Sequence, residues 1–148
     1  MRVSTVPKEA VKHVWDDVEE LLRKSVEDTS RGKINILDVL DGILRDIYVL
    51  WVVLDEEDNM VAAITTRIAT YPRRKAMVLD FVGGTKLHKW KDTVIETIGR
   101  FAKENDCQHL EGYGRKGWER ALRGNGFYSE YIASVSYTHL TLPTKRIV

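Results

Sequence analysis

The sequence predicts a single mixed α/β domain, in which a central and mostly antiparallel sheet is flanked by helices. Amphipathic stretches, with apolar residues three or four positions apart, occur before and after a central block and indicate helices. The central block instead holds continuous apolar runs separated by short polar turns, which is typical of hairpins. Because 43% of the 148 residues are hydrophobic, the chain can bury one core.

Two helices are expected first. Residues 8–29 carry one apolar stripe, formed by Val11, Val14, Trp15, Val18, Leu21 and Leu22. Pro7 suits the start of this helix, where its missing N–H costs nothing. A shorter helix should follow Asn35, a good N-cap residue, with an apolar side made of Val39, Leu40, Ile43 and Leu44.

Strands then follow in a regular order. Three of them are expected at 48–54, 60–71 and 76–82, separated by the polar turns 55–59 and 72–75. The remaining elements are a helix at 87–105, a strand at 107–113, a short helix at 116–123 that ends at a glycine, and a strand at 127–134. The side chains of Trp15, Trp51 and Trp118 are expected in the core.

The C-terminal residues differ from the rest. From Ser134 on the chain has no acidic residue, and the stretch VSYTHLTLPT resembles the translation of an adapter used in sequencing libraries. We therefore expect a domain over 1–133 and a non-native tail over 134–148, with the native C-terminus missing. The alternative is a natural terminal strand rich in Thr and Tyr.

Composition argues against several kinds of partner. The formal net charge of +1 gives no reason to expect nucleic acid or an anionic membrane. No apolar run approaches a membrane span and the N-terminus lacks a signal peptide, so we expect a cytoplasmic protein. The single cysteine, Cys107, is expected to be a small buried residue. No metal site is predicted, because His13, His88 and His109 lack the spacing of metal ligands.

This order of elements is similar to that of the GNAT superfamily of N-acetyltransferases. The resemblance covers about residues 1–133 and is clearest in GWERALRGNGF, where family members commonly have a short helix closed by Gly-Phe. The sequence pattern YPRRK…GG…W…GYGRKGWERAL…GF most resembles a small branch of GNAT-like proteins found in phages and prophages. The resemblance implies an acyl-CoA-dependent N-acyltransferase, in which a small-molecule or protein amine attacks the thioester of acetyl-CoA directly.

The resemblance also implies where coenzyme A would bind. GNAT enzymes hold its pyrophosphate on a basic, glycine-containing loop that opens a helix. The corresponding loop here is about Lys86–Lys91, where lysines replace the glycines, and the pair Gly83–Gly84 comes earlier. The expected cofactor-binding residues are Val82, Gly83, Gly84, Lys86 and Lys89. The alternatives are a simple pair of turn glycines and a solvated first helical turn.

Three residues are candidates for catalysis: Asp80, Glu111 and Tyr113. Asp80 is expected on the strand face opposite Met77, Leu79 and Phe81, either as a general base for an amine or as a paired structural carboxylate. Glu111 and Tyr113 should lie near the cleft. Tyr113 is the best substitute for the Tyr general acid of the family, whose position is taken here by Leu122.

A second interpretation is a non-catalytic GNAT-fold protein of a phage, acting as an internal virion or host-interaction component. The altered loop and the missing Tyr favour it, whereas the retained architecture and Gly83–Gly84 favour the enzyme. Its location would be the host cytoplasm or the virion, and the sequence leaves the oligomeric state open.

For a working enzyme, strands 76–82 and 107–113 should splay apart near Val82 and Tyr113 to admit the pantetheine arm.

Overall fold

A computed structural model describes residues 1–113 and 120–127 of the chain. The chain divides into two compact units, 1–114 and 115–148. The sheet of the first unit has the strand order β1-β2-β3-β4-β5. Its strands are β1 (Arg2–Val6), β2 (Val49–Leu54), β3 (Met60–Thr70), β4 (Lys75–Gly84) and β5 (His109–Gly112). Its helices are η1 (Lys8–Ala10), α1 (Val11–Ser30), α2 (Ile36–Leu44) and α3 (Leu87–Glu104).

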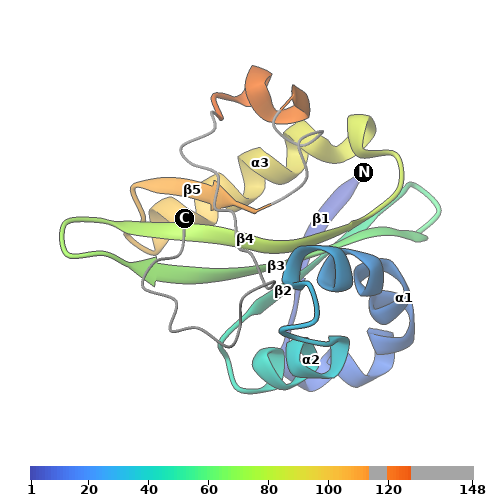
Figure 1. The fold of residues 1–148 in the computed structure, drawn as a ribbon. Helices are drawn as coiled ribbons and strands as arrows, with labels where there is room; N and C mark the ends of the chain where they lie inside the picture. Colours follow the sequence, from blue (N-terminus) through green and yellow to red (C-terminus); the bar gives the residue numbers. More distant parts are fainter. Residues whose placement is uncertain (114–119, 128–148) are drawn as a thin grey trace. The chain divides into compact units, whose positions relative to one another are not determined.

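The strands β1 to β4 pair antiparallel in chain order, and β5 pairs parallel to β4. Helices α1 and α2 cover one face of this sheet, and α3 covers the other (Figure 1). The predicted fold class, a mixed and mostly antiparallel sheet flanked by helices, is confirmed. Within the described ranges, no helix is both long and apolar enough to cross a membrane.

Each face of the sheet has its own packing. On the α1 side, buried strand residues such as Leu50, Val52 and Phe81 pack with Val18 and Leu22 of α1. On the α3 side, the rings of Trp51 and Phe101 meet edge to face, with centroids 5.1 Å apart. Consecutive residues of β2 therefore point to opposite covered faces, which is why this strand is apolar throughout.

Most predicted elements are found within a few residues of the expected bounds. The Asn35 cap is confirmed, because its Oδ1 accepts hydrogen bonds from the N–H groups of Leu37 and Asp38, each at 3.0 Å. Strand β1 was not predicted. It pairs with β2 from Arg2 opposite Leu54 to Val6 opposite Leu50, and α1 begins only after η1.

The prediction of core tryptophans is confirmed for Trp51 and only in part for Trp15. Trp51 is buried, and its Nε1 donates a hydrogen bond to Thr66 Oγ1 at 2.9 Å. Trp15 is half-buried and packs against the core cluster on the α1 side. Cys107 is buried, as expected. Trp118 lies outside the described residues.

The second unit is described only over 120–127. Residues 120–122 are helical and continue into the 3-10 turn η2 (Arg123–Asn125). Gly126 follows with φ 84°, so the predicted glycine stop is confirmed. The predicted tail over 134–148 and nearly all of the predicted last strand lie outside the described residues.

The end of β4 passes very close to α1. A Cβ atom added to Gly83 would lie 2.0 Å from the backbone oxygen of Leu21. Gly84 has φ 152°, and a Cβ atom there would lie 2.4 Å from the backbone oxygen of Val61. Steric contact therefore requires both glycines, whatever further role they have.

We predict that Gly83→Ala lowers the free energy of unfolding by about 1–3 kcal/mol, because α1 and β4 must move apart to admit the methyl group. Gly99→Ala is the matched control. No atom lies within 4 Å of the added Cβ in α3, so this change should stabilise the helix by about 0.5–1 kcal/mol. Urea unfolding measures both values, and equal stability of the two variants would contradict the close approach.

Candidate functional site

A β-bulge in β4 shapes the candidate site. Thr65 of β3 lies opposite Phe81, but the next residue, Thr66, lies opposite Leu79, so Asp80 is an extra residue in β4. In a regular strand, neighbouring side chains point to opposite faces. Here Asp80 and Phe81 line the same pocket. The expectation that Asp80 faces away from Phe81 is therefore wrong, because the inserted residue breaks the alternation.

This pocket, called the Asp80 pocket below, has a volume of about 200 Å³. It is formed by the end of α1 with the following turn, by β4, and by the residue after β5. Its lining residues are Thr29, Ser30, Lys33, Ile34, Asp80, Phe81 and Tyr113. Two of the three predicted catalytic residues, Asp80 and Tyr113, thus come together in one pocket.

Arg67 of β3 is the charged partner of Asp80. Its Nε lies 2.7 Å from Asp80 Oδ2, so the two side chains form an ion pair. The Asp80 side chain is only 11% exposed. Burial raises the pKa of Asp80 above the ordinary carboxyl value of 3.8, and the polar contact with Arg67, together with its positive charge, opposes part of this rise.

Two phenols lie near this pair. Tyr113 lines the pocket and is 45% exposed. Tyr48 packs edge to face against Phe81, with ring centroids 6.2 Å apart. Burial, and after it the negative charge of Asp80, raise the pKa of Tyr48. Tyr48 therefore stays protonated, and it packs against the core cluster beside Phe81.

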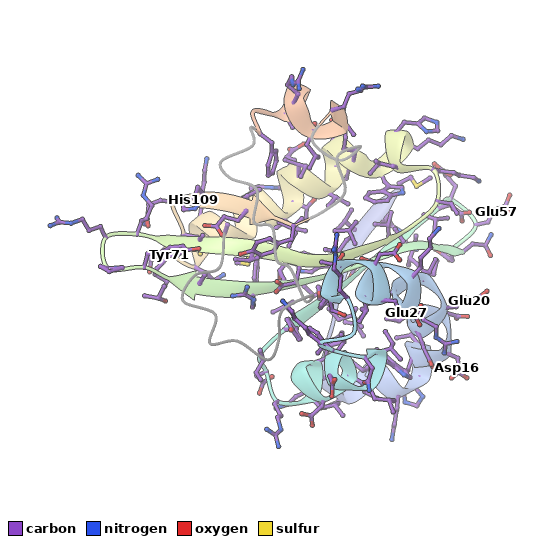
Figure 2. The ribbon with its side chains drawn as sticks, viewed as in Figure 1. Asp16, Glu20, Glu27, Glu57, Tyr71 and His109 are labelled. Atoms are coloured by element: carbon purple, nitrogen blue, oxygen red, sulfur yellow. The ribbon has the colours of Figure 1, made fainter. Side chains whose placement is uncertain are left out.

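Glu111, the third predicted catalytic residue, belongs to a different cluster. Its Oε1 lies 2.8 Å from His109 Nε2, and its Oε2 accepts a hydrogen bond from the Tyr71 hydroxyl at 2.9 Å. The rings of Tyr71 and His109 stack with centroids 6.4 Å apart (Figure 2). Glu111 does not line the Asp80 pocket, and both of its carboxylate oxygens are engaged.

The edge of β4 beyond the bulge is a second feature of the site. The pairing of β4 with β5 runs from Ala76 opposite His109 to Leu79 opposite Gly112. Strand β4 continues to Gly84, so Asp80–Gly84 extends past the last residue of β5. Among the described residues, the pairing of β4 with β5 thus ends just before the bulge at Asp80.

Two backbone N–H groups point to this edge. Because Thr85 N–H donates to Val61 O at 3.0 Å, the alternation of an antiparallel ladder turns the N–H groups of Gly84 and Val82 away from β3. Val82 N–H meets Ser25 Oγ of α1 at 3.3 Å. This is longer than a typical N–H···O bond, so the contact is a weak one.

Lys86 and Lys89 face an acidic neighbourhood. They line a hollow of about 470 Å³ together with Met1, Asn59 and three acidic residues of the β2–β3 turn, Asp55, Glu56 and Glu57. The N–H of Asn59 is the main cause of a lowered pKa at Asp55, and the charge of Lys86 adds to it. Glu57 lies at the opposite end of the sheet from Tyr71 and His109 (Figure 2).

The start of α3 is open to a negatively charged group. Lys86, its N-cap residue, has φ 59° and makes no side-chain cap, and the first turn carries no acidic residue. Uncapped N–H groups at a helix start carry partial positive charge, which favours anions. Among the described residues, no group of three or more His, Cys, Asp or Glu side chains could hold a metal ion.

Arg67 and Ser25 belong to the site but were not predicted from the sequence. Arg67 is the one charged residue inside the otherwise apolar and Thr-rich stretch MVAAITTRIAT, and this contrast could have indicated a buried ion pair. Ser25 gave no such signal, because a serine within an amphipathic helix is unremarkable in sequence. Its contact with Val82 depends on how closely α1 crosses β4.

No protein-family model matches the sequence, and no curated protein sequence matches it significantly. Solved structures do match. The crystal structure of "a probable acetyltransferase" has a TM-score of 0.67 at 15% identity, over 92% of this chain and 99% of that one. Glucosamine-6-phosphate N-acetyltransferase from Arabidopsis thaliana has a TM-score of 0.61 at 12% identity, over 93% and 97%.

An aminoglycoside N-acetyltransferase, solved in complex with CoA, matches with a TM-score of 0.62 at 12% identity, over 94% of both chains. At these identities the likeness concerns the fold. The chain has the GNAT fold of N-acetyltransferases, as its sequence predicts, and the fold alone does not define a substrate.

The pKa of Asp80 leads to a prediction about pH and stability. Because the folded pKa is raised, the native state binds a proton more readily than the unfolded chain between 3.8 and that higher pKa. The wild type should therefore lose stability relative to Asp80→Asn as the pH rises through this window, with no further change above it. Urea unfolding of both proteins across pH tests this. A difference that is independent of pH, or that has the opposite slope, would contradict the assignment.

Proposed function

We propose that the protein is an acyl-CoA-dependent N-acyltransferase, in which the amine of an acceptor attacks the thioester directly. One observation carries the proposal: Asp80, a nearly buried carboxylate with a raised pKa, is the first residue beyond the part of β4 that pairs with β5. In this proposal the carboxylate acts as the base, next to a strand edge that holds the acyl donor. The GNAT fold of the chain supports the same conclusion.

In this proposal the donor lies along the unpaired edge of β4. The amides of a pantetheine arm would take the place of a strand, accepting from and donating to the backbone of Val82 to Gly84. Its phosphates would lie near the start of α3, close to Lys86 and Lys89, where uncapped N–H groups favour negative charge. Acetyl-CoA supplies the acyl group as an activated thioester.

The acceptor amine would enter the Asp80 pocket. Its nitrogen attacks the carbonyl carbon, the C–S bond breaks, and the proton from the amine passes to the Asp80 carboxylate. Tyr113 would donate a proton to the departing thiolate. Arg67 opposes part of the pKa rise that burial causes at Asp80. Glu111 takes no part, because His109 and Tyr71 hold it.

The pocket limits the part of the acceptor that it can enclose. Its volume of about 200 Å³ is below the usual range for drug-sized ligands, so it suits the amine-bearing end of a small molecule or of a protein side chain.

With acetyl-CoA as donor, we expect the protein to work in the cytoplasm, or in the cytoplasm of the host if it is phage-encoded.

A second candidate function is a non-catalytic GNAT-fold protein of a phage. The surroundings of Lys86 and Lys89 favour it. Asp55, Glu56 and Glu57 line the same hollow as the two lysines, and their negative charge opposes the binding of phosphate there. The two candidates differ in one property that can be measured directly, the binding of coenzyme A.

We predict that acetyl-CoA raises the thermal midpoint of the wild type and of Asp80→Asn alike, because a ligand of the native state stabilises it. Only the wild type should then release CoA in the presence of amines. Loss of a general base should lower the turnover of Asp80→Asn by about 100- to 10,000-fold. Differential scanning fluorimetry and a thiol-release assay measure the two effects.

Asp17→Asn is the control, since it makes the same chemical change at an exposed position of α1. It should retain both binding and turnover. If neither CoA nor acetyl-CoA shifts the midpoint of the wild type, the enzyme is excluded and the non-catalytic protein takes its place. If turnover survives in Asp80→Asn, the role of Asp80 as base is wrong.

A further inference from the structure

The described residues leave an apolar surface on α2 exposed. In the described part of the chain, three of the six large apolar side chains that are extensively exposed lie within 37–47. They are Leu37 at 62% exposed, Leu44 at 49% and Ile47 at 54%. These three residues are called the α2 patch below. Apolar side chains gathered in this way mark interaction surfaces more often than singly exposed ones do.

The patch lies beside the side of α2 that packs on the sheet. Val39 and Ile43 are buried in the core, so the inward side of the helix is defined. Leu37 and Leu44 are seven residues apart, which places them on one side of the helix, two turns from each other. Ile47 follows in the turn after the helix. A helix with so broad an apolar surface is typical of one buried against a second partner.

The helix presents this patch rigidly. The capping box of Asn35 and Asp38 fixes its first turn. At the other end, Lys8 Nζ lies 2.8 Å from Asp46 Oδ2, which ties the turn after α2 to the residues that follow β1. Little conformational freedom is therefore left to lose when a partner covers the patch.

The charges beside the patch indicate what the partner is. Asp38 and Asp41 lie in the first part of α2, and Arg45 follows its last residue. All three side chains are exposed, and Arg45 Nε lies 3.3 Å from Asp41 Oδ2. The helix is thus acidic toward its start, and its end carries Arg45 together with Asp46, whose charge is paired with that of Lys8. A surface of this kind is complementary to an identical one that runs in the opposite direction.

We propose that the α2 patch is the self-association surface of this protein, on which α2 of a second copy packs antiparallel about a two-fold axis. In this arrangement Leu37 of each copy lies near the partner's Ile47, and Arg45 lies near the partner's Asp38. A parallel arrangement would instead place like charges opposite each other. This interaction does not depend on the proposed enzymatic function.

The test is the molar mass of the full chain in solution, measured by sedimentation equilibrium over a wide concentration range. The wild type should be a dimer that dissociates on dilution. Leu44→Glu should raise the dissociation constant at least tenfold, because it places a charge in the centre of the patch. Arg45→Glu should weaken association by a smaller factor. Added salt should reduce the difference in dissociation constant between this variant and the wild type, because salt screens the charges.

Ile68→Glu is the matched control. Ile68 of β3 is 42% exposed and lies outside the α2 patch, so this variant should associate like the wild type. If Leu44→Glu does not fold, Leu37→Glu gives the same test at a more exposed position near the helix start. A wild type that is monomeric at every concentration, or a dimer that the patch variants leave intact, would overturn the proposal.

Discussion

The single inserted residue in β4 is the constraint on which the rest of the site depends. It turns Asp80 to the same side of β4 as Phe81, so a carboxylate lines the Asp80 pocket. In a strand with regular alternation of side chains, Asp80 would point to the opposite face. It also coincides with the point where β5 stops pairing with β4. Among the described residues, one local irregularity thus brings a carboxylate next to a strand edge that β5 does not cover.

The packing of α1 on β4 makes this arrangement rigid. Gly83 has no room for a Cβ atom beneath Leu21, and Val82 meets Ser25 of the same helix. The helix then ends at Ser30, and its last residues line the Asp80 pocket. The same contact that closes the core on the α1 side therefore also fixes one wall of the pocket and the edge of β4.

Periodicity in the sequence predicted the elements well because each has a clear apolar pattern. The apolar stripe of α3 and the continuous apolar run of β2 are examples. Strand β1 was missed, since RVSTV is short and half polar and becomes a strand only through its pairing with β2. The bulge was missed because one inserted residue leaves composition and spacing unchanged. The separation of Glu111 from Asp80 arises from contacts between distant residues, Tyr71 among them, which no local pattern contains.

In the proposed function, the edge of β4 beyond the bulge receives the acyl donor. Amide hydrogen exchange followed by NMR, with and without CoA, tests this at the level of single residues. We expect CoA to slow exchange at Val82 and Gly84, while amides already hydrogen-bonded to β3, such as that of Thr85, change little. Binding of CoA that leaves the amides of Val82 and Gly84 unprotected would contradict it.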